Sequence, residues 1–254
     1  MIPKIIHYCW FGDAEPSDKM KKCMSSWKKY CKDYKIICWN EENIDFNHIA
    51  YLKEAYEEKK WSFVSDVVRL IAVSKYGGIY LDTDVELVNN LDSLLSYKGY
   101  FGFEEGVYIN TGLGFGAEKD NVFVKAMLED YGNRHFKENG MMNMVPCPHL
   151  NTEVLEKMGL KRNGTFQIID GTAFLPTEYL CPLDYQTGKI KMTDNTISIH
   201  HYNSSWMTED DIRKREIFMH YQNRYGLNAG KILASIKIYG ISKSVSLLIR
   251  KIVG

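Results

Sequence analysis

Two aspartates lie two residues apart in the stretch YGGIYLDTDVE, which spans residues 76–86. We expect a strand over 79–87, and side chains two apart in a strand project from the same face, so Asp82 and Asp84 point the same way. Two unpaired carboxylates side by side repel each other. Burial disfavours the charged form, so it would raise the pKa of a carboxyl group rather than leave both groups charged. A divalent cation removes the conflict, because hard oxygen ligands suit Mn²⁺ or Mg²⁺. The spacing therefore favours a metal site, with a solvated acidic loop as the alternative.

The segment before this pair, SFVSDVVRLIAVSKYGG at 62–78, predicts a buried helix that carries a charge pair. Apolar residues cover most of the helix circumference, and Ser65, Asp66 and Arg69 share the remaining narrow face. Asp66 and Arg69 are neighbours at a spacing of three, and a charge pair on a buried helix needs a strong reason. Two interpretations stay open. The pair either closes the core as a structural ion pair or reaches a polar ligand at the sheet edge, where open α/β sheets bind substrates.

A third group of polar residues lies in SIHHYNSSW, residues 198–206. Adjacent residues of a strand point to opposite faces, so only one of His200 and His201 can meet a metal held by the acidic pair. A histidine at a strand end is commonly a packed or solvated residue. In a chain that also has the acidic pair, it becomes a candidate third ligand.

Asn110 lies in VYINTGLGFGA, residues 107–117, which has the alternation of a strand. Small residues here allow a ligand close to the backbone, and an amide can grip sugar hydroxyls as donor and acceptor. A glycine-kinked core strand explains the same pattern equally well.

Composition restricts the class of protein. The chain has 254 residues, 45% hydrophobic and 25% charged residues, and a net charge of zero, which is typical of a soluble globular protein without a bias towards nucleic acid. Its six cysteines show no CxxC pairing, which favours reduced thiols and a cytoplasmic location. The stretch MIPKIIHYCWFG lacks the apolar region of a signal peptide, and no stretch reaches the roughly 18 apolar residues that cross a bilayer, so we expect a protein that contacts membranes at most peripherally.

Strands alternate with helices along the chain. This order predicts an α/β fold with a mostly parallel central sheet. Thr208 followed by three acidic residues is typical of a helix start, because the helix dipole favours acids in the first turn. We therefore expect a catalytic domain over 1–206 and a C-terminal helical region over 207–254.

Taken together, these motifs resemble glycosyltransferase family 32, the D-x-D sugar transferases. The resemblance runs through IPKIIHYCWFG, SWKKYCKDYKIICWNEEN, SDVVRLIAVSKYGGIYLDTDVE and SIHHYNSSW in the expected order. It is weak over about 118–195, where VPCPHLNT replaces the Thr/Ser-Gly-Pro and Thr of many relatives. The resemblance implies a GT-A type nucleotide-sugar-binding fold, a Mn²⁺ or Mg²⁺ cofactor and transfer with retention at the anomeric carbon.

The resemblance also implies roles for individual residues. Trp10, with Cys9 beside it, is similar to the aromatic that stacks on the nucleotide base. Asp66 and Arg69 are similar to the pair that contacts the ribose and the donor sugar. Asp82 resembles the member that touches ribose and metal-bound water, and Asp84 the direct metal ligand. The segment HHYNSSW resembles the element that completes metal coordination and closes over the diphosphate, with Ser204, Ser205 and Trp206 as contact candidates. The Trp206 indole N–H could donate to the diphosphate oxygens.

Two other classes of protein fit less well. A phosphatase with an aspartyl nucleophile expects its acidic motif on the first strand and Thr or Ser two residues after the second aspartate, where this chain has Glu86. A non-catalytic sugar-binding module would not need Asp66, Arg69 and a separated histidine together. We therefore expect a metal-dependent retaining glycosyltransferase. It would move a sugar from a nucleotide-sugar, with UDP expected, to a glycan or lipid-linked oligosaccharide acceptor in capsule or lipopolysaccharide synthesis.

The C-terminal stretch 231–254 contains five basic residues and no acidic residue. Its apolar positions recur at spacings of three and four, as in a basic amphipathic helix that lies on anionic lipid. This predicts peripheral contact with the cytoplasmic face of the inner membrane, with a helix packed on the catalytic domain as the alternative.

Overall fold

The computed structural model describes residues 1–185, 187–202 and 209–241. It divides the chain into two compact units. The first comprises Met1–Leu183 and Lys191–Tyr202, and the second holds the described residues of Asp184–Ile190 and Asn203–Gly254. The segment Asp184–Ile190, which we had expected in the catalytic domain, thus clusters with the second unit. In the described part of the chain, no helix is long and apolar enough to cross a membrane.

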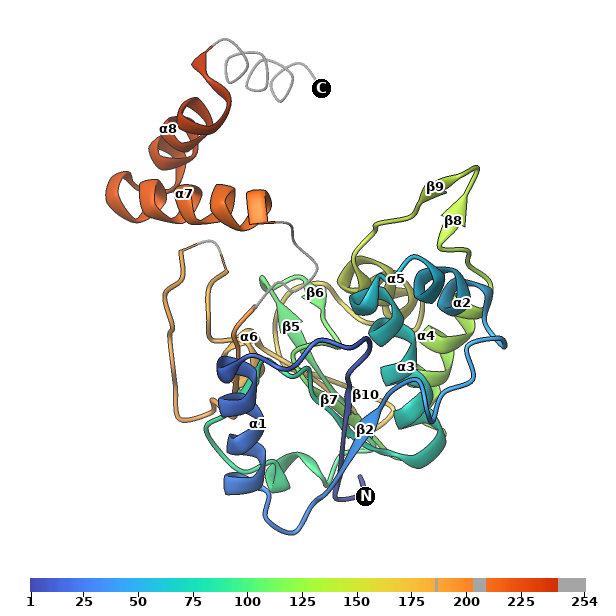
Figure 1. The fold of residues 1–254 in the computed structure, drawn as a ribbon. Helices are drawn as coiled ribbons and strands as arrows, with labels where there is room; N and C mark the ends of the chain where they lie inside the picture. Colours follow the sequence, from blue (N-terminus) through green and yellow to red (C-terminus); the bar gives the residue numbers. More distant parts are fainter. Residues whose placement is uncertain (186, 203–208, 242–254) are drawn as a thin grey trace. The chain divides into compact units, whose positions relative to one another are not determined.

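A mixed sheet forms the centre of the first unit (Figure 1). Its strand order is β10 (Gln167–Ile169), β11 (Thr172–Leu175), β5 (Gly99–Glu104), β7 (Phe115–Ala117), β3 (Gly78–Tyr80), β1 (Ile5–Cys9) and β2 (Lys35–Trp39), and β6 (Tyr108–Ile109) pairs with β5. The strands β2, β1, β3, β5 and β11 run in one direction, whereas β7 lies antiparallel between β3 and β5 and β10 is antiparallel to β11. The predicted α/β fold with a mostly parallel sheet is confirmed.

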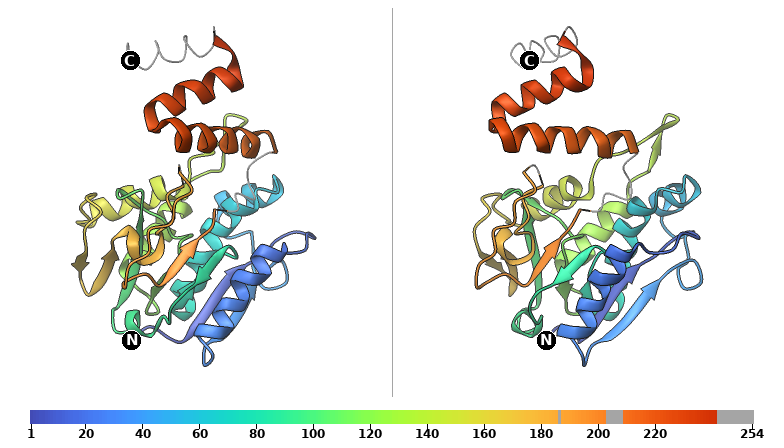
Figure 2. Two further views of the ribbon diagram at one scale, coloured as in Figure 1. Left: turned by 90° about the vertical axis from the view of Figure 1, so that its left-hand side faces the viewer. Right: turned by 60° about the vertical axis from the view of Figure 1, so that its left-hand side comes forward.

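Helices cover both faces of this sheet (Figures 1 and 2). Side chains alternate between two cores: Ile79 and Tyr100 pack on one face, and Tyr80 and Phe101 on the other. The first face is covered by α1 (Asp18–Tyr30), η1 (Asp92–Leu94) and α6 (Thr177–Leu180). The second is covered by α2 (Ala50–Glu57), α3 (Trp61–Tyr76), α4 (Val122–Gly132) and α5 (Cys147–Lys157).

The expected strand over 79–87 is wrong. The chain leaves the main sheet after Tyr80, makes a turn in which Val85 N donates to Asp82 O, and resumes as β4 (Val85–Leu87). β4 pairs antiparallel with β12 (Ser198–His200) in a separate two-stranded ladder. The acidic pair therefore lies in the turn between two strands, at the carboxyl end of β3. The strand expected within 107–117 is also divided, into β6 and β7, and Asn110 lies in the connection after β6.

α3 and β3 are joined by the double glycine Gly77-Gly78. Both have positive φ values, 64° and 106°, which favour glycine. A Cβ at Gly78 would lie 2.7 Å from the Ile5 carbonyl oxygen, so only glycine fits against β1 there. The helix predicted within 62–78 begins at Trp61, and its N-cap, Lys60, makes no side-chain cap bond. This tight reversal brings the end of β3 back alongside the polar face of α3.

The second unit contains a pair of helices, α7 (Glu209–Tyr225) and α8 (Leu227–Tyr239). Gly226, with φ 80°, separates them. The helices pack closely, because a Cβ at Gly230 would lie 2.4 Å from Gln222 Cα, and Ala234 is fully buried. Thr208, the expected helix start, lies outside the described residues, as does the tail 242–254.

Candidate active site at the D-x-D turn

The structure brings Asp82, Asp84 and His200 together. The register of the β4–β12 ladder pairs Val85 with His200, which places the imidazole beside the turn. His200 Nε2 lies 3.1 Å from Asp84 Oδ1 and 4.0 Å from Asp82 Oδ2. One ligand atom from each of the three residues lies within 4.8 Å of the others, a set that could hold a metal ion.

His201 lies outside this cluster, which corrects its inclusion among the candidate ligands. Its side chain points to the opposite face of the ladder, where Nε2 lies 2.8 Å from Glu86 Oε2. Its backbone N–H donates to the Asp84 carbonyl at 3.1 Å. The alternation of β12 therefore assigns His200 to the carboxylates and His201 to the ladder edge.

The cluster carries the electrostatics of a cation site. Burial raises the pKa of Asp82. The Arg69 guanidinium opposes this rise, and the neighbouring Asp84 carboxylate adds to it. Burial lowers the pKa of His200, but the carboxylates around it, with Asp84 first and Asp82 next, together outweigh burial, so the net pKa of His200 lies above its ordinary value. Among the residues that the structure describes, none is a hydrogen-bond partner of the buried Nδ1 of His200. Two carboxylates and one imidazole fit Mn²⁺ or a similar divalent ion.

Arg69 connects Asp66, its partner on α3, to the acidic turn. Its Nη2 lies 3.0 Å from Asp66 Oδ1 and 3.3 Å from Asp82 Oδ1, and Arg69 is 3% exposed. Its guanidinium lies 4.9 Å from the centre of the Tyr80 ring, and the Tyr80 hydroxyl donates to Asp82 Oδ1 at 2.9 Å. Burial raises the pKa of Asp66 to about 6, although Arg69 opposes the rise. The pair is therefore part of the acidic site rather than a separate closure of the core.

The connection after β6 packs directly against Asp82. A Cβ at Gly112 would lie 2.4 Å from Asp82 Oδ2, so only glycine leaves room for this carboxylate. Asn110 holds the connection, because its Oδ1 accepts from Gly112 N at 2.6 Å and its Nδ2 donates to Glu104 Oε2 at 3.1 Å. Arg69 Nη1 donates to Thr111 Oγ1 at 3.3 Å. Asn110 thus lies at the site, and its amide makes hydrogen bonds to Gly112 and Glu104 that hold the connection after β6 in place.

Three residues that the sequence did not suggest also reach this site. Glu104 ends β5 and accepts the Asn110 amide. Cys147 begins α5, and its Sγ lies 3.8 Å from Arg69 Nη1. Asn151, one turn later, donates to Thr111 Oγ1 at 3.1 Å. The sequence showed only an unusual VPCPHLNT stretch, and no local pattern links it to a helix almost eighty residues earlier.

The remaining site candidates lie at the end of β1 or outside the described part. Cys9 is buried, and burial raises the pKa of its thiol to about 12, so it acts as a neutral packing residue. Trp10 follows at the carboxyl end of β1, is partly exposed, and donates from Nε1 to the Ala14 carbonyl at 2.8 Å. Ser204, Ser205 and Trp206 fall outside the described residues.

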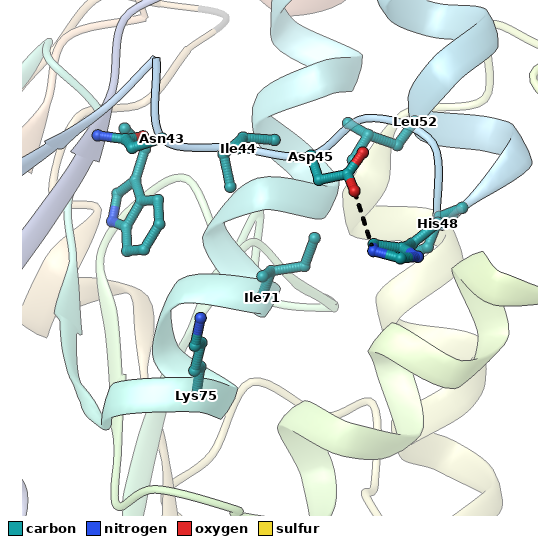
Figure 3. A pocket seen from close by; sticks show the side chains of 9 residues that line it. Asn43, Ile44, Asp45, His48, Leu52, Ile71 and Lys75 are labelled. Carbon is teal, nitrogen blue, oxygen red and sulfur yellow. Dashed lines mark ion pairs between the residues drawn. The ribbon is translucent and has the colours of Figure 1, made fainter. Parts of the chain in front are cut away.

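A cavity of about 420 Å³ lies elsewhere in the first unit (Figure 3). It is lined mainly by apolar side chains and shares no residue with the acid–histidine cluster. Its one carboxylate, Asp45, is paired with His48 at 3.0 Å. The cavity lacks the convergent ligands of the D-x-D turn, so we assign the chemistry to the turn. The lining residues are Trp39, Asn43, Ile44, Asp45, His48, Ile49, Leu52, Ile71 and Lys75.

Comparison with known families agrees with this geometry. Residues 17–100 match the family model described as the glycosyltransferase sugar-binding region containing the DXD motif. The resemblance to the D-x-D sugar transferases is confirmed. The matched sugar-binding region includes α3 with Asp66 and Arg69, and both aspartates of the turn.

Individual relatives match part of the chain. Inositol phosphoceramide mannosyltransferase 3 of Schizosaccharomyces pombe is 35% identical over 103 residues, which cover 39% of this chain and 29% of that protein. Lactosylceramide 4-alpha-galactosyltransferase of Homo sapiens is 28% identical over 127 residues, which cover 50% of this chain and 34% of that protein. The chain thus spans less than two thirds of the length of these relatives. Among solved structures, PaToxG glycosyltransferase is 19% identical with a TM-score of 0.49, covering 62% of this chain and 69% of that chain.

The two histidines give a direct test of the metal site. Loss of a residue that hydrogen-bonds to a metal ligand lowers metal affinity by about 10–100-fold. His200→Gln removes a ligand itself, so it should weaken Mn²⁺ binding by at least this factor, and Asp84→Asn should do the same. His201→Gln is the matched control and should bind Mn²⁺ like the unaltered chain. Isothermal titration with Mn²⁺ alone measures all four. Equal losses for both histidine variants would contradict the assignment.

Proposed function

We propose that this chain is a metal-dependent glycosyltransferase of the GT-A type that moves a sugar from a nucleotide-sugar, a UDP-sugar in the first instance, with retention at the anomeric carbon. The observation that carries the proposal is the cluster of Asp82, Asp84 and His200, connected through Arg69 to Asp66 inside the matched sugar-binding region. These groups converge at the carboxyl end of a strand, where α/β sheets bind ligands.

Asp84, His200 and Asp82 would hold the ion. When bound, Mn²⁺ or Mg²⁺ would stabilise the negative charge that builds on the β-phosphate as it leaves the sugar. Among the described residues, the His200 imidazole lies 3.1 Å from Asp84 and the buried Arg69 guanidinium lies 3.3 Å from Asp82. The mixed oxygen and nitrogen donors favour Mn²⁺, since Mg²⁺ is bound mainly through oxygen.

The chain's own side chains would bind and orient the donor. Arg69 and Asp66 would contact the ribose and sugar, both being fixed by burial on α3. Trp10 would stack on the base, and the indole N–H of Trp206, with Ser204 and Ser205, would donate to the diphosphate. No carboxylate is needed as a nucleophile if the acceptor attacks on the face that the diphosphate leaves, which gives retention.

The acceptor would be a glycan or a lipid-linked oligosaccharide of a surface polysaccharide. A lipid-linked acceptor is supported by two relatives whose names specify a mannosyltransferase of inositol phosphoceramide and a galactosyltransferase of lactosylceramide. Peripheral membrane contact at the cytoplasmic face would follow. In α8, Ile232 and Leu233 are 42% and 37% exposed, and Lys231 and Lys237 are exposed beside them.

Donor hydrolysis tests the proposed activity. Incubation with a panel of UDP- and GDP-sugars and Mn²⁺ should release the sugar from one donor, and chelation by EDTA should abolish release. Asp84→Asn should lower the rate at least about 100-fold, as loss of a main electrostatic group does, while unfolding like the unaltered chain. Retained nucleotide binding without hydrolysis or transfer from any donor would instead favour a sugar-binding module.

Base stacking gives a separate prediction for Trp10. Trp10→Ala should weaken UDP binding by about 1–3 kcal/mol, the range for one base stacked on one aromatic ring. Trp61→Ala, another partly exposed tryptophan of the same unit, is the comparison variant. Calorimetry with UDP and Mn²⁺ measures both. An unchanged Kd for Trp10→Ala would leave Trp10 as a packing residue.

Membrane contact is tested on the full chain. Lys231→Glu with Lys237→Glu should reduce co-sedimentation with anionic vesicles by about tenfold or more, because each basic residue near the surface contributes about 1 kcal/mol. Lys19→Glu with Lys22→Glu on α1 has the same change in charge and should bind as before. Equal binding by all three proteins would contradict the assignment of α8.

A further inference from the structure

The candidate ion site is assembled from two segments that are far apart in the chain. Asp82 and Asp84 come from the turn between β3 and β4, and His200 ends β12. The β4–β12 ladder joins these segments through three residue pairs, of which Val85 with His200 is nearest to the turn. Two-stranded ladders are marginally stable by themselves, so further contacts must hold the ligands in place.

Glu104 supplies such a contact on the side of the acidic turn. It ends β5, and its side chain is half-buried. Its Oε2 accepts a hydrogen bond from Asn110 Nδ2 at 3.1 Å, and Asn110 Oδ1 accepts from Gly112 N at 2.6 Å. Gly112 packs on Asp82 so closely that a Cβ at this position would collide with Asp82 Oδ2. A continuous series of contacts therefore runs from the Glu104 carboxylate to the Asp82 carboxylate.

The chemistry of Glu104 fixes the orientation of the Asn110 amide. A carboxylate can only accept hydrogen bonds, whereas an amide has one end that donates and one end that accepts. If the Asn110 amide were reversed, its oxygen would face the Glu104 carboxylate and its NH₂ group would face the Gly112 N–H. Both contacts would then be repulsive, so the carboxylate keeps Oδ1 on Gly112 N.

The same carboxylate also acts on the β12 side of the site. The Tyr202 ring lies against the His200 ring, with centroids 4.3 Å apart in a T-shaped arrangement. Tyr202 has a φ of 48°, a conformation that bulky residues keep only where surrounding contacts hold it. The Tyr202 hydroxyl lies 2.9 Å from Cys181 Sγ. Burial raises the pKa of this hydroxyl and the charge of Glu104 raises it further, which places Glu104 close to Tyr202 as well.

We propose that Glu104 is a positioning residue of the ion site, which fixes the Asp82 carboxylate through Asn110 and Gly112. The proposal rests on the metal-dependent function proposed above and adds a residue to it. Among the described residues, the candidate ligand cluster comprises two aspartates and His200 and does not include Glu104. Groups outside the coordination shell commonly orient the ligands of a metal in this way.

Mn²⁺ binding tests this role. Glu104→Gln keeps the size of the side chain but replaces the carboxylate by an amide, which can both donate and accept and so no longer fixes the Asn110 amide. Mn²⁺ affinity should fall by about tenfold or more, as it does when an outer partner of a metal ligand is lost. Glu105→Gln removes the same charge from the next, exposed residue and should bind Mn²⁺ like the unaltered chain. Isothermal titration with Mn²⁺ alone measures all three proteins.

Asn110→Ala separates positioning from the effect of charge. This variant keeps the charge of Glu104 and removes the amide through which Glu104 acts, so it should lower Mn²⁺ affinity as Glu104→Gln does. Combining both substitutions should weaken binding by less than about twofold more, because losses within one network of contacts do not add. If the two losses multiply instead, Glu104 acts through its charge alone, and the positioning role is overturned.

Hydrogen exchange gives a readout that needs neither metal nor donor. The Gly112 N–H is protected by its hydrogen bond to Asn110 Oδ1. Exchange in peptides that cover 110–114 should be faster in full-length Glu104→Gln and unchanged in Glu105→Gln. Exchange in β1 and β3 should stay the same in both variants, which would show that the fold is intact.

The outcomes separate this proposal from the proposed function. If the unaltered chain binds no Mn²⁺, the metal-dependent function fails. Faster exchange over 110–114 in Glu104→Gln would then still support its role in positioning Asn110, and unchanged exchange would overturn that role. If the unaltered chain and Glu104→Gln bind Mn²⁺ equally well, the positioning role is overturned. Equal losses in Glu104→Gln and Glu105→Gln would overturn it too, because charge rather than contact would then matter.

Discussion

A buried arginine between two carboxylates organises the whole candidate site. Arg69 lies within 3.0 Å of Asp66 and 3.3 Å of Asp82, and each partner comes from a different element. Removing a guanidinium from water is costly, and only close opposite charges and further hydrogen bonds offset the cost. The surrounding structure supplies them through the carbonyl of Ser65, the hydroxyl of Thr111 and the face of the Tyr80 ring. An apolar α3, packed nearly all round, is what keeps this charge in one place.

The second constraint is space beside Asp82. The carboxylate lies against the backbone at Gly112, and the double glycine at 77–78 lets α3 reverse into β3 against Ile5. Both glycines at the reversal have positive φ values, so neither position accepts another residue without strain. The acidic turn therefore lies between α3, through Arg69, and the connection at Gly112.

The first unit combines a buried polar centre with a projecting hairpin of β8 (Lys137–Glu138) and β9 (Met141–Met142) (Figure 1). At the base of the hairpin, Lys137 N donates to Glu54 Oε2 at 2.9 Å, and Asn143 N donates to the carbonyl of the fully buried Phe136 at 2.7 Å. The hairpin gains its order from Glu54 and Phe136, whereas the polar centre gains its order from burial.

The sequence alone predicted the class of fold, the buried α3 with its charge pair, and a candidate metal site at the acidic pair, because these depend on local periodicity and on the chemistry of adjacent residues. It also showed that only one of His200 and His201 could meet the carboxylates. Tertiary structure decided which one, because the register of β4 against β12 is a pairing between segments more than a hundred residues apart. It also moved the aspartates from a strand into a turn and brought Glu104, Cys147 and Asn151 to the site. Those contacts depend on how the chain crosses the sheet, and no short-range pattern in the residues themselves encodes that crossing.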